Sequence, residues 1–185
     1  VTMDIHVSPA GNLPEVLPRL GMSMKLPADC DRVSWLGRGP GESYEDSKEA
    51  NLYGFYCSDV DSMLTPYVRP QENGNRTDVS WVALSDLGGN GILVAGKPSV
   101  NLSAHRYTAH DLTNAEHTHE LIPRDEITLN LDYKQNALGA SSCGPSPLHK
   151  YRLKPEETRF QLRFLPFQMN SVSLPVQGRC WPEEV

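Results

Sequence analysis

The chain has 185 residues, 38% of them hydrophobic and 22% charged, and a formal net charge of −6 at pH 7. One domain with a sizeable core fits this length, while the composition excludes a disordered or fibrous protein and the acidic balance argues against a nucleic-acid surface. No apolar run approaches the ~20 residues of a membrane span, and the first residues lack a signal-peptide core. We therefore expect a cytoplasmic protein with no membrane or nucleic-acid partner.

Nine short segments alternate in polarity or are rich in β-branched and aromatic residues: 3–7, 20–26, 32–36, 52–57, 78–84, 92–96, 101–107, 126–131 and 159–165. Clusters of Gly, Pro, Asn or Asp separate most of them. This pattern of short strand segments separated by turns predicts an all-β protein built on an antiparallel sheet. The first residues enter a strand pattern directly, so we expect an edge that needs a partner, in a chain cut from, or assembled with, something larger.

One helix is predicted at residues 108–116, where Thr108 is an N-cap candidate and Leu112 and Ala115 share a face. A second helical turn is a weaker prediction at residues 47–52. The glycine-rich stretch at 37–42 lacks the Lys-Ser/Thr ending of a phosphate-binding loop and predicts a tight turn. Residues 170–185 lose the alternation, and we interpret them as a tail after one domain at residues 1–169.

The cysteines are four and widely spaced: Cys30, Cys57, Cys143 and Cys180. None forms a C-x-x-C pair, so neither a zinc ribbon nor a thioredoxin-type site is indicated. Two disulfides would be arithmetically allowed in a secreted protein. Free thiols are the expectation, because a chain of this length does not need disulfides to fold.

Candidate chemistry is spread over several polar groups. His117 and His119, two residues apart, would share a strand face and with His105 could hold a metal, although a polar stripe of hydrogen-bonded imidazoles is the plainer interpretation. Paired carboxylates for glycoside hydrolysis can be drawn from several acids, which otherwise serve as solvated surface charges: Glu42, Glu45, Asp46, Glu72 and Asp78. Some aromatic residues offer a stacking face for a sugar, with core packing as the alternative: Trp35, Trp81, Tyr67 and Tyr107.

The most polar stretch is residues 69–78, R-P-Q-E-N-G-N-R-T-D. Asn73-Gly74 suits a tight turn, because both residues tolerate a positive φ. Turn formation leaves Glu72, Arg76 and Asp78 unexplained. They are either solvated loop charges or parts of a polar site.

Several motifs follow one another in the order known from one protein family: Leu17-Pro18-Arg19-Leu20-Gly21, Val33-x-Trp35-x-Gly37-Arg38-Gly39-Pro40-x-Glu42-x-Tyr44-x-Asp46, residues 67–78, Ser103-x-His105-Arg106-Tyr107, Leu129-Asn130-Leu131-Asp132, and residues 139–145. On these motifs the chain resembles the C-terminal domain, or separate small subunit, of the glycoside hydrolase family 2 β-galactosidases. The resemblance covers about residues 17–167. It implies a β-supersandwich of the galactose mutarotase type. An upstream R-A-P-x-D-N-D type motif of the family is absent, so we expect an N-terminally incomplete domain that lacks its upstream strands.

The resemblance also implies roles for residues. The catalytic glutamates of the family lie on a separate (β/α)8 barrel, so no catalytic residue and no metal ligand is assigned here, and any Mg²⁺ or Na⁺ belongs to the catalytic domain of the complete enzyme rather than to this chain. The loop at 139–145 is implied to face the aglycone side of the substrate, and Cys143 matches a position held by Trp or Cys in the family. The predicted substrate-binding residues are Cys143, Gly144, Glu72, Asn73, Arg76 and His119.

The function implied is that of a part of a β-galactosidase that hydrolyses terminal β-D-galactosides such as lactose. The implied partners are the galactoside, the barrel-containing catalytic part, and further copies or subunits in a homo- or hetero-oligomer. One alternative is a mutarotase-like aldose epimerase, with Glu72 and either His119 or His105 as acid and base. Another is a non-catalytic carbohydrate-binding module.

Overall fold

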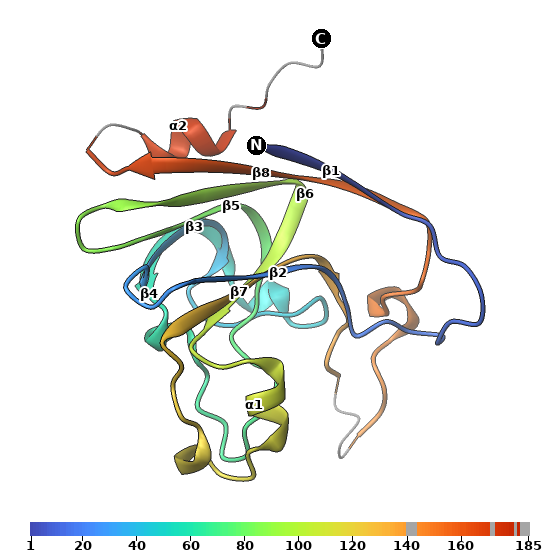
Figure 1. Cartoon of the computed structure of the whole chain (residues 1–185). Helices are drawn as coiled ribbons and strands as arrows, with labels where there is room; N and C mark the ends of the chain where they lie inside the picture. The colour runs from blue at the N-terminus through green and yellow to red at the C-terminus, as the bar shows by residue number, and fades with distance from the viewer. Residues whose placement is uncertain (140–143, 171–172, 180, 182–185) are drawn as a thin grey trace.

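A computed structural model describes residues 1–139, 144–170, 173–179 and 181 of the chain. Eight antiparallel strands form one branched sheet (Figure 1): β1 (Thr2–Val7), β2 (Arg19–Pro27), β3 (Arg32–Gly39), β4 (Leu52–Asp59), β5 (Arg76–Ser85), β6 (Asn90–His105), β7 (Glu126–Gln135) and β8 (Thr158–Gln168). The all-β prediction is confirmed. Each predicted strand segment overlaps one of these strands.

The sheet branches along β6. Its order is β1-β8-β6-β5-β3-β4, and β7 pairs with both β6 and β2. Residues 90–97 of β6 pair with β8, whereas residues 101–105 pair with β7. Pro98 lies between these two ladders, where its missing N–H removes no ladder hydrogen bond. The sequence pattern divided β6 into two strands, because a proline ordinarily interrupts a central strand, but the chain runs through as one.

The larger apolar cluster among the described residues forms the main core of the domain. Both branches contribute to it, with Leu129 and Leu131 from β7 and Phe160 and Leu162 from β8. The core also holds Trp35, which is 1% exposed and stacks on Tyr56 at 5.4 Å between ring centroids. Burial of this apolar surface at roughly 25 cal/mol per Å² is the main stabilising term of such a domain.

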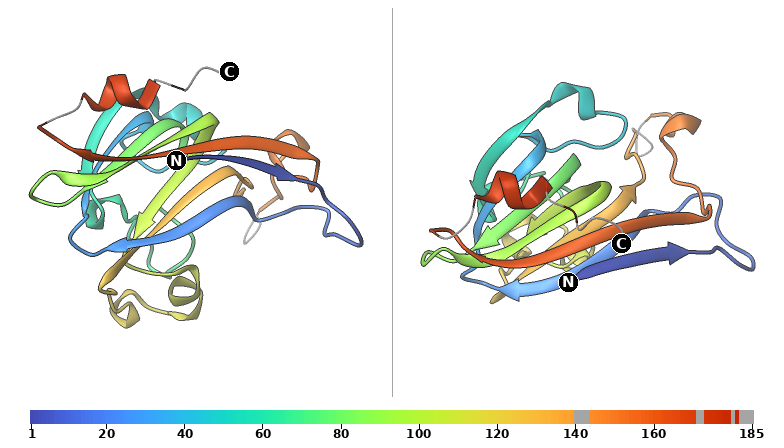
Figure 2. Two further views of the ribbon diagram at one scale, coloured as in Figure 1. Left: turned by 45° about the horizontal axis from the view of Figure 1, so that its top comes forward. Right: turned by 90° about the horizontal axis from the view of Figure 1, so that it is seen from above.

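A second apolar cluster forms on the other face of β5 and β6, under helix α2 (Leu174–Arg179). This helix falls within the segment 170–185, where the sequence pattern indicated a tail. Gly178 is required for the close approach, because a Cβ there would stand 2.3 Å from the ring of Trp81. Leu174 completes the contact, so this part of the C-terminal segment packs on the sheet (Figure 2).

The connections follow the predicted local signals with one exception. Helix α1 (Ala109–Asn114) begins after Thr108, whose side chain forms a capping box with Asp111. Within residues 47–52 a single 3₁₀ turn, Lys48–Ala50, is formed. The predicted tight turn at 37–42 is wrong for its first residues, because Gly37 continues β3 so closely against Val79 that a Cβ would lie 2.8 Å away.

Cys30 and Cys57, the two cysteines within the described residues, are free thiols. In the same part of the chain, no helix combines the length and the apolar character needed to cross a membrane.

Candidate functional site

Residues 69–78 are largely buried at their centre. Asn73 and Arg76 are 2% and 4% exposed, so they are not solvated loop charges. Gly74 adopts a φ of +73°, but Asn73 does not have a positive φ and residues 73–75 form no assigned turn, so the predicted tight turn at Asn73-Gly74 is wrong. The missing side chain of Gly74 leaves room for His105, whose ring would lie 2.6 Å from a Cβ. The segment therefore turns inward and presents its polar groups to the surrounding loops.

Arg76 holds three main-chain segments together. Its Nη1 donates to the carbonyls of Met63 at 3.0 Å and Gly74 at 2.7 Å, and its Nη2 donates to the carbonyl of Pro40 at 2.9 Å. The guanidinium also lies over the Trp35 ring, 5.7 Å from its centroid. Burial lowers the pKa of Arg76 to about 10, so the side chain is still protonated at neutral pH.

The side chain of Asn73 also forms hydrogen bonds to main-chain groups. Its Oδ1 accepts from the N–H of Thr65 at 3.0 Å, and its Nδ2 donates to the carbonyl of Gln71 at 2.9 Å. The carbonyl of Asn73 accepts from His105 Nε2 at 2.9 Å. Because a carbonyl only accepts, His105 carries its proton on Nε2. Burial lowers the pKa of His105, which keeps the imidazole neutral.

Two neighbouring loops meet at Glu42. This carboxylate accepts from the hydroxyl of Tyr67 and, at 2.8 Å, from the N–H of Gly74. The bond to Glu42 raises the pKa of Tyr67 to about 12. Tyr44 lies nearby, and burial together with the negative charges of Glu72 and Glu42 raises its pKa. The carboxylate of Glu42 thus connects the loop at 40–47 to the loop at 64–75.

Glu72 belongs to a charged cluster with Arg19 and Asp132. Arg19 Nη2 lies 2.9 Å from Asp132 Oδ2 and 3.6 Å from Glu72 Oε1. Gly21 lets β2 approach β7 here, because a Cβ would stand 2.3 Å from the Cα of Asp132. Burial raises the pKa of Asp132 to about 6 in spite of the opposing effect of Arg19. We call Arg19, Glu72 and Asp132 the Arg19 cluster.

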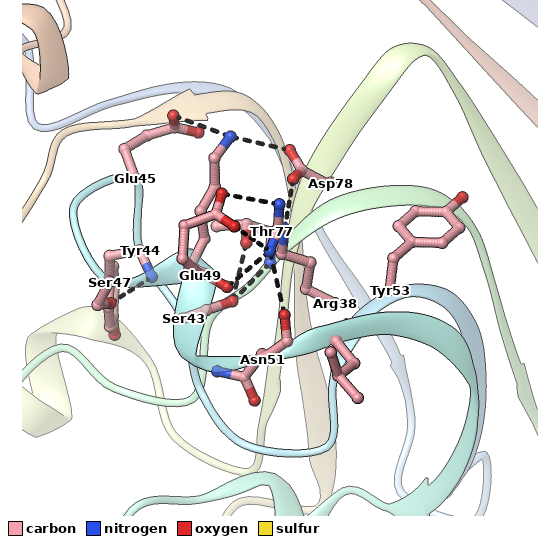
Figure 3. A network of polar contacts seen from close by, with 12 residues as sticks. Arg38, Ser43, Tyr44, Glu45, Ser47, Glu49, Asn51, Tyr53, Thr77 and Asp78 are labelled. Atoms are coloured by element: carbon pink, nitrogen blue, oxygen red, sulfur yellow. Dashed lines mark hydrogen bonds and ion pairs between the residues drawn. The ribbon is translucent and has the colours of Figure 1, made fainter.

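Arg38 organises a second charged network (Figure 3). Its Nε donates to Asp78 at 2.8 Å, and its Nη2 donates to Glu49 at 2.9 Å. Lys48 Nζ lies 3.2 Å from Asp78 and 3.4 Å from Glu45. Asp78 has a φ of +55°, a region that non-glycine residues seldom adopt. The network holds the 3₁₀ turn at Lys48–Ala50 against the sheet.

At Asp78 we expect replacement by glycine to destabilise the protein less than replacement by alanine, which is the reverse of the usual order within a strand. Both Asp78→Ala and Asp78→Gly lose the contacts to Arg38 and Lys48, but only alanine keeps the strain of a positive φ, which costs about 1–2 kcal/mol. We expect Asp78→Gly to be more stable than Asp78→Ala by about 1 kcal/mol. Urea unfolding measures the difference, and an alanine variant at least as stable as the glycine variant would contradict it.

The loop at 139–145 starts from a fixed point. Gly139, at a φ of +59°, donates its N–H to Asp46 Oδ2 at 2.9 Å. Pro147 packs on it, because a Cβ at Gly139 would lie 2.7 Å from Pro147 Cδ. The carbonyl of Pro147 in turn accepts from Arg152 Nε at 3.1 Å. Gly144 is exposed, and Cys143 lies outside the described residues.

The histidines are not gathered into one site. His117 and His119 do not share a strand face as predicted, because His117 precedes and His119 lies within the short 3₁₀ turn Thr118–Glu120, where their rings stack with centroids 5.4 Å apart. His105 is instead buried against residues 73–74. Over the described ranges, no three His, Cys, Asp or Glu side chains come together as a metal ion would need. Of the predicted substrate-binding residues, Glu72, Asn73 and Arg76 occupy one polar region, and no interaction joins His119 to them.

Two members of this region were not singled out as site residues from the sequence: Arg19 and Tyr44. Each lies in a motif quoted above, but the pairing of Arg19 with Asp132 spans 113 residues. Neither the residue types nor their spacing in the sequence predicts such a contact. Of the aromatic candidates, Trp35 and Trp81 are core residues, at most 1% exposed.

The fold is an antiparallel β domain, and the buried polar side chains of the site bind main-chain groups of the surrounding loops. The loop that starts at Gly139 is anchored to one of these loops through Asp46. The chain belongs to the beta-galactosidase small chain family, which it matches over residues 1–164. Proteins named beta-galactosidase share 35% identity over 77% of the chain in Priestia megaterium, 34% over 86% in an Arthrobacter species, and 32% over 89% in Vibrio vulnificus. The chain spans only 14–16% of the length of these three relatives.

Proposed function

We propose that this chain is part of a β-galactosidase that hydrolyses terminal β-D-galactosides such as lactose. The observation that carries the proposal is the family match over residues 1–164. Because the named relatives are about six to seven times longer than the matched segment, the bond-breaking groups are assigned to another part of the enzyme. The 185-residue chain alone is expected to be inactive.

The part played by this chain is to complete the edge of the active site. Two features support it. Gly139, where the loop at 139–145 begins, is hydrogen-bonded to Asp46, and hydrogen bonds of Glu42 and Arg76 connect the loops at 40–47 and 64–75. Groups that contact the substrate need such a support, because their misplacement by about 1 Å costs up to ~100-fold in rate. Cys143 and Gly144 remain the predicted contacts with the substrate.

The proposal predicts an effect of Asp46→Ala in the complete enzyme. Without the carboxylate, Gly139 loses its anchor, and we expect kcat/KM for lactose to fall about tenfold while hydrolysis of a simple aryl galactoside changes less. Cys143→Ala should shift acceptor or aglycone preference in the same direction. Steady-state kinetics with both substrates, and product analysis of galactosyl transfer to added acceptors, measure the effect.

Asp86→Ala is the matched control. Asp86 also accepts from a main-chain N–H, that of Asn90 at 2.9 Å, but it does so in the turn between β5 and β6. This control should leave the ratio of the two activities unchanged. Equal losses for lactose and the aryl galactoside in Asp46→Ala and Cys143→Ala would contradict the role at the aglycone side. A complete enzyme with no activity on any galactoside would contradict the proposed function itself.

A further inference from the structure

The loop at 139–145 leaves the domain and returns to it through two stems that touch each other. The stems are residues 136–139, after β7, and residues 147–153, before β8, and we call them the loop neck. They meet where the loop begins, because a Cβ on Gly139 would lie 2.7 Å from Pro147 Cδ. The loop therefore leaves and re-enters the domain at neighbouring positions.

Hydrogen bonds close the neck at its end nearest the sheet. The N–H of Ala137 donates to the carbonyl of Tyr151 at 3.3 Å, and the N–H of Leu153 donates to Asn136 Oδ1 at 3.0 Å. Ala137 and Leu153 are both buried. These bonds join the two stems to each other where they enter the domain.

Two charged side chains hold the other end of the neck, one on each stem. Asp46 Oδ2 accepts from the N–H of Gly139 at 2.9 Å, and Arg152 Nε donates to the carbonyl of Pro147 at 3.1 Å. Hydrogen bonds with one charged partner are roughly twice as strong as neutral ones. Because Gly139 and Pro147 are in contact, the two side chains restrain the same point from different parts of the chain.

We propose that Arg152 is a positioning residue for the substrate-facing loop, and that it acts together with Asp46 on the loop neck. The inference rests on the proposed function, because it needs the loop to face the aglycone side of a galactoside. Arg152 acts through the main chain of Pro147 rather than by touching the substrate. Two restraints on one unit are coupled, because the unit can move once either is lost and the loss of the second then adds little.

A second contact of Arg152 supplies the matched control. Its Nη1 lies 3.3 Å from Glu15 Oε1, and the side chain of Glu15 is 77% exposed. An ion pair with so exposed a partner contributes little. Glu15→Gln removes this ion pair and leaves the bond from Arg152 to Pro147 in place, so it should change neither the loop neck nor the substrate preference.

Steady-state kinetics of the complete enzyme test the role of Arg152. We expect Arg152→Met to lower the ratio of kcat/KM for lactose to kcat/KM for a simple aryl galactoside about fivefold, and Glu15→Gln to leave it within about twofold. A purely structural role would lower both activities equally. Arg152→Lys is the milder variant, because it keeps the charge without the planar fork, and it should change the ratio in the same direction.

The double variant tests the coupling. Asp46→Ala combined with Arg152→Met should lower the ratio little more than Asp46→Ala alone, whereas independent effects would multiply.

Hydrogen exchange of the complete enzyme, followed by mass spectrometry, gives a result that does not depend on activity. The N–H of Gly139 is protected by its bond to Asp46. Arg152→Met should speed exchange in residues 136–139 about tenfold, because the neck opens locally, while Glu15→Gln should match the unmodified enzyme.

The outcomes separate this inference from the proposed function. In an enzyme that is active on galactosides, an unchanged ratio in Arg152→Met and Arg152→Lys, multiplied losses in the double variant, or unchanged exchange at residues 136–139 would overturn the role of Arg152 and leave the proposed function standing. A complete enzyme without activity on any galactoside would contradict the proposed function, and with it the role of Arg152 toward the substrate.

Discussion

Arg76→Met should lower the free energy of unfolding by about 3–5 kcal/mol. The methionine keeps much of the volume but removes the donors to the carbonyls of Met63, Gly74 and Pro40. Each buried carbonyl left without a donor costs about 1–3 kcal/mol. The gain from no longer burying a charge offsets part of this loss. Urea unfolding of the 185-residue chain, followed by tryptophan fluorescence because Trp35 lies against Arg76, measures the change.

Two further variants separate the hydrogen bonds from the charge. Arg76→Lys keeps the charge but has no planar fork for three carbonyls, so we expect it to recover only a minor part of the loss. Arg32→Met removes an arginine whose side chain is 59% exposed at the start of β3, and it should change stability by less than about 0.5 kcal/mol. An Arg76→Met variant as stable as Arg32→Met would refute the structural role assigned to Arg76.

Asp132→Asn should gain stability relative to the unmodified chain as the pH rises. The pKa of Asp132 is about 6 in the folded chain, against about 3.9 for an unfolded aspartate. Between these values the native state holds a proton that the unfolded state has released, so the free energy of unfolding falls with rising pH. Asparagine does not titrate. We expect the difference, variant minus unmodified chain, to rise by roughly 2–3 kcal/mol between pH 4 and pH 7.

The control for this pH effect is Asp111→Asn, for which a nearly flat difference is expected between pH 4 and pH 7. Arg124 and the capping bonds hold the pKa of Asp111 well below its usual range, so its contribution to stability is present above the unfolded pKa of about 3.9 and is lost only as the pH falls below that value. Other titrating groups are common to all three proteins and cancel in the differences. Unfolding curves at several pH values are sufficient. A difference for Asp132→Asn that is flat or falls from pH 4 to pH 7 would contradict the elevated pKa.

Much of the secondary structure could be predicted, because it depends on local patterns. Alternating polarity located the strands, and Thr108 with the apolar pair Leu112 and Ala115 located α1. Prediction failed where a distant contact overrides a local signal. Pro98 indicated a strand end, but it sits where β6 changes neighbours and no ladder bond is lost. The loss of alternation after residue 169 indicated a tail, but residues 174–179 form α2, in which Gly178 allows close packing on Trp81.

The polar region was predicted in part. The density of charge at residues 69–78 drew attention to Glu72, Asn73 and Arg76, and the structure brings them together. The sequence left open whether they are solvated, and burial decides this for Asn73 and Arg76. Their hydrogen-bond partners are mostly main-chain carbonyls and N–H groups, which have no signature in a sequence because every residue carries them.

The sequence by itself determined that the chain is an antiparallel β protein, and its ordered motifs indicated the β-galactosidase family that the comparison confirms. Only the tertiary structure decided how the charges are paired. Arg19 meets Asp132 and Gly139 meets Asp46 across 113 and 93 residues of chain. Contacts of this range depend on the branching of the sheet and on close approaches at glycines, whereas periodicity reports only which face of its own strand a residue occupies.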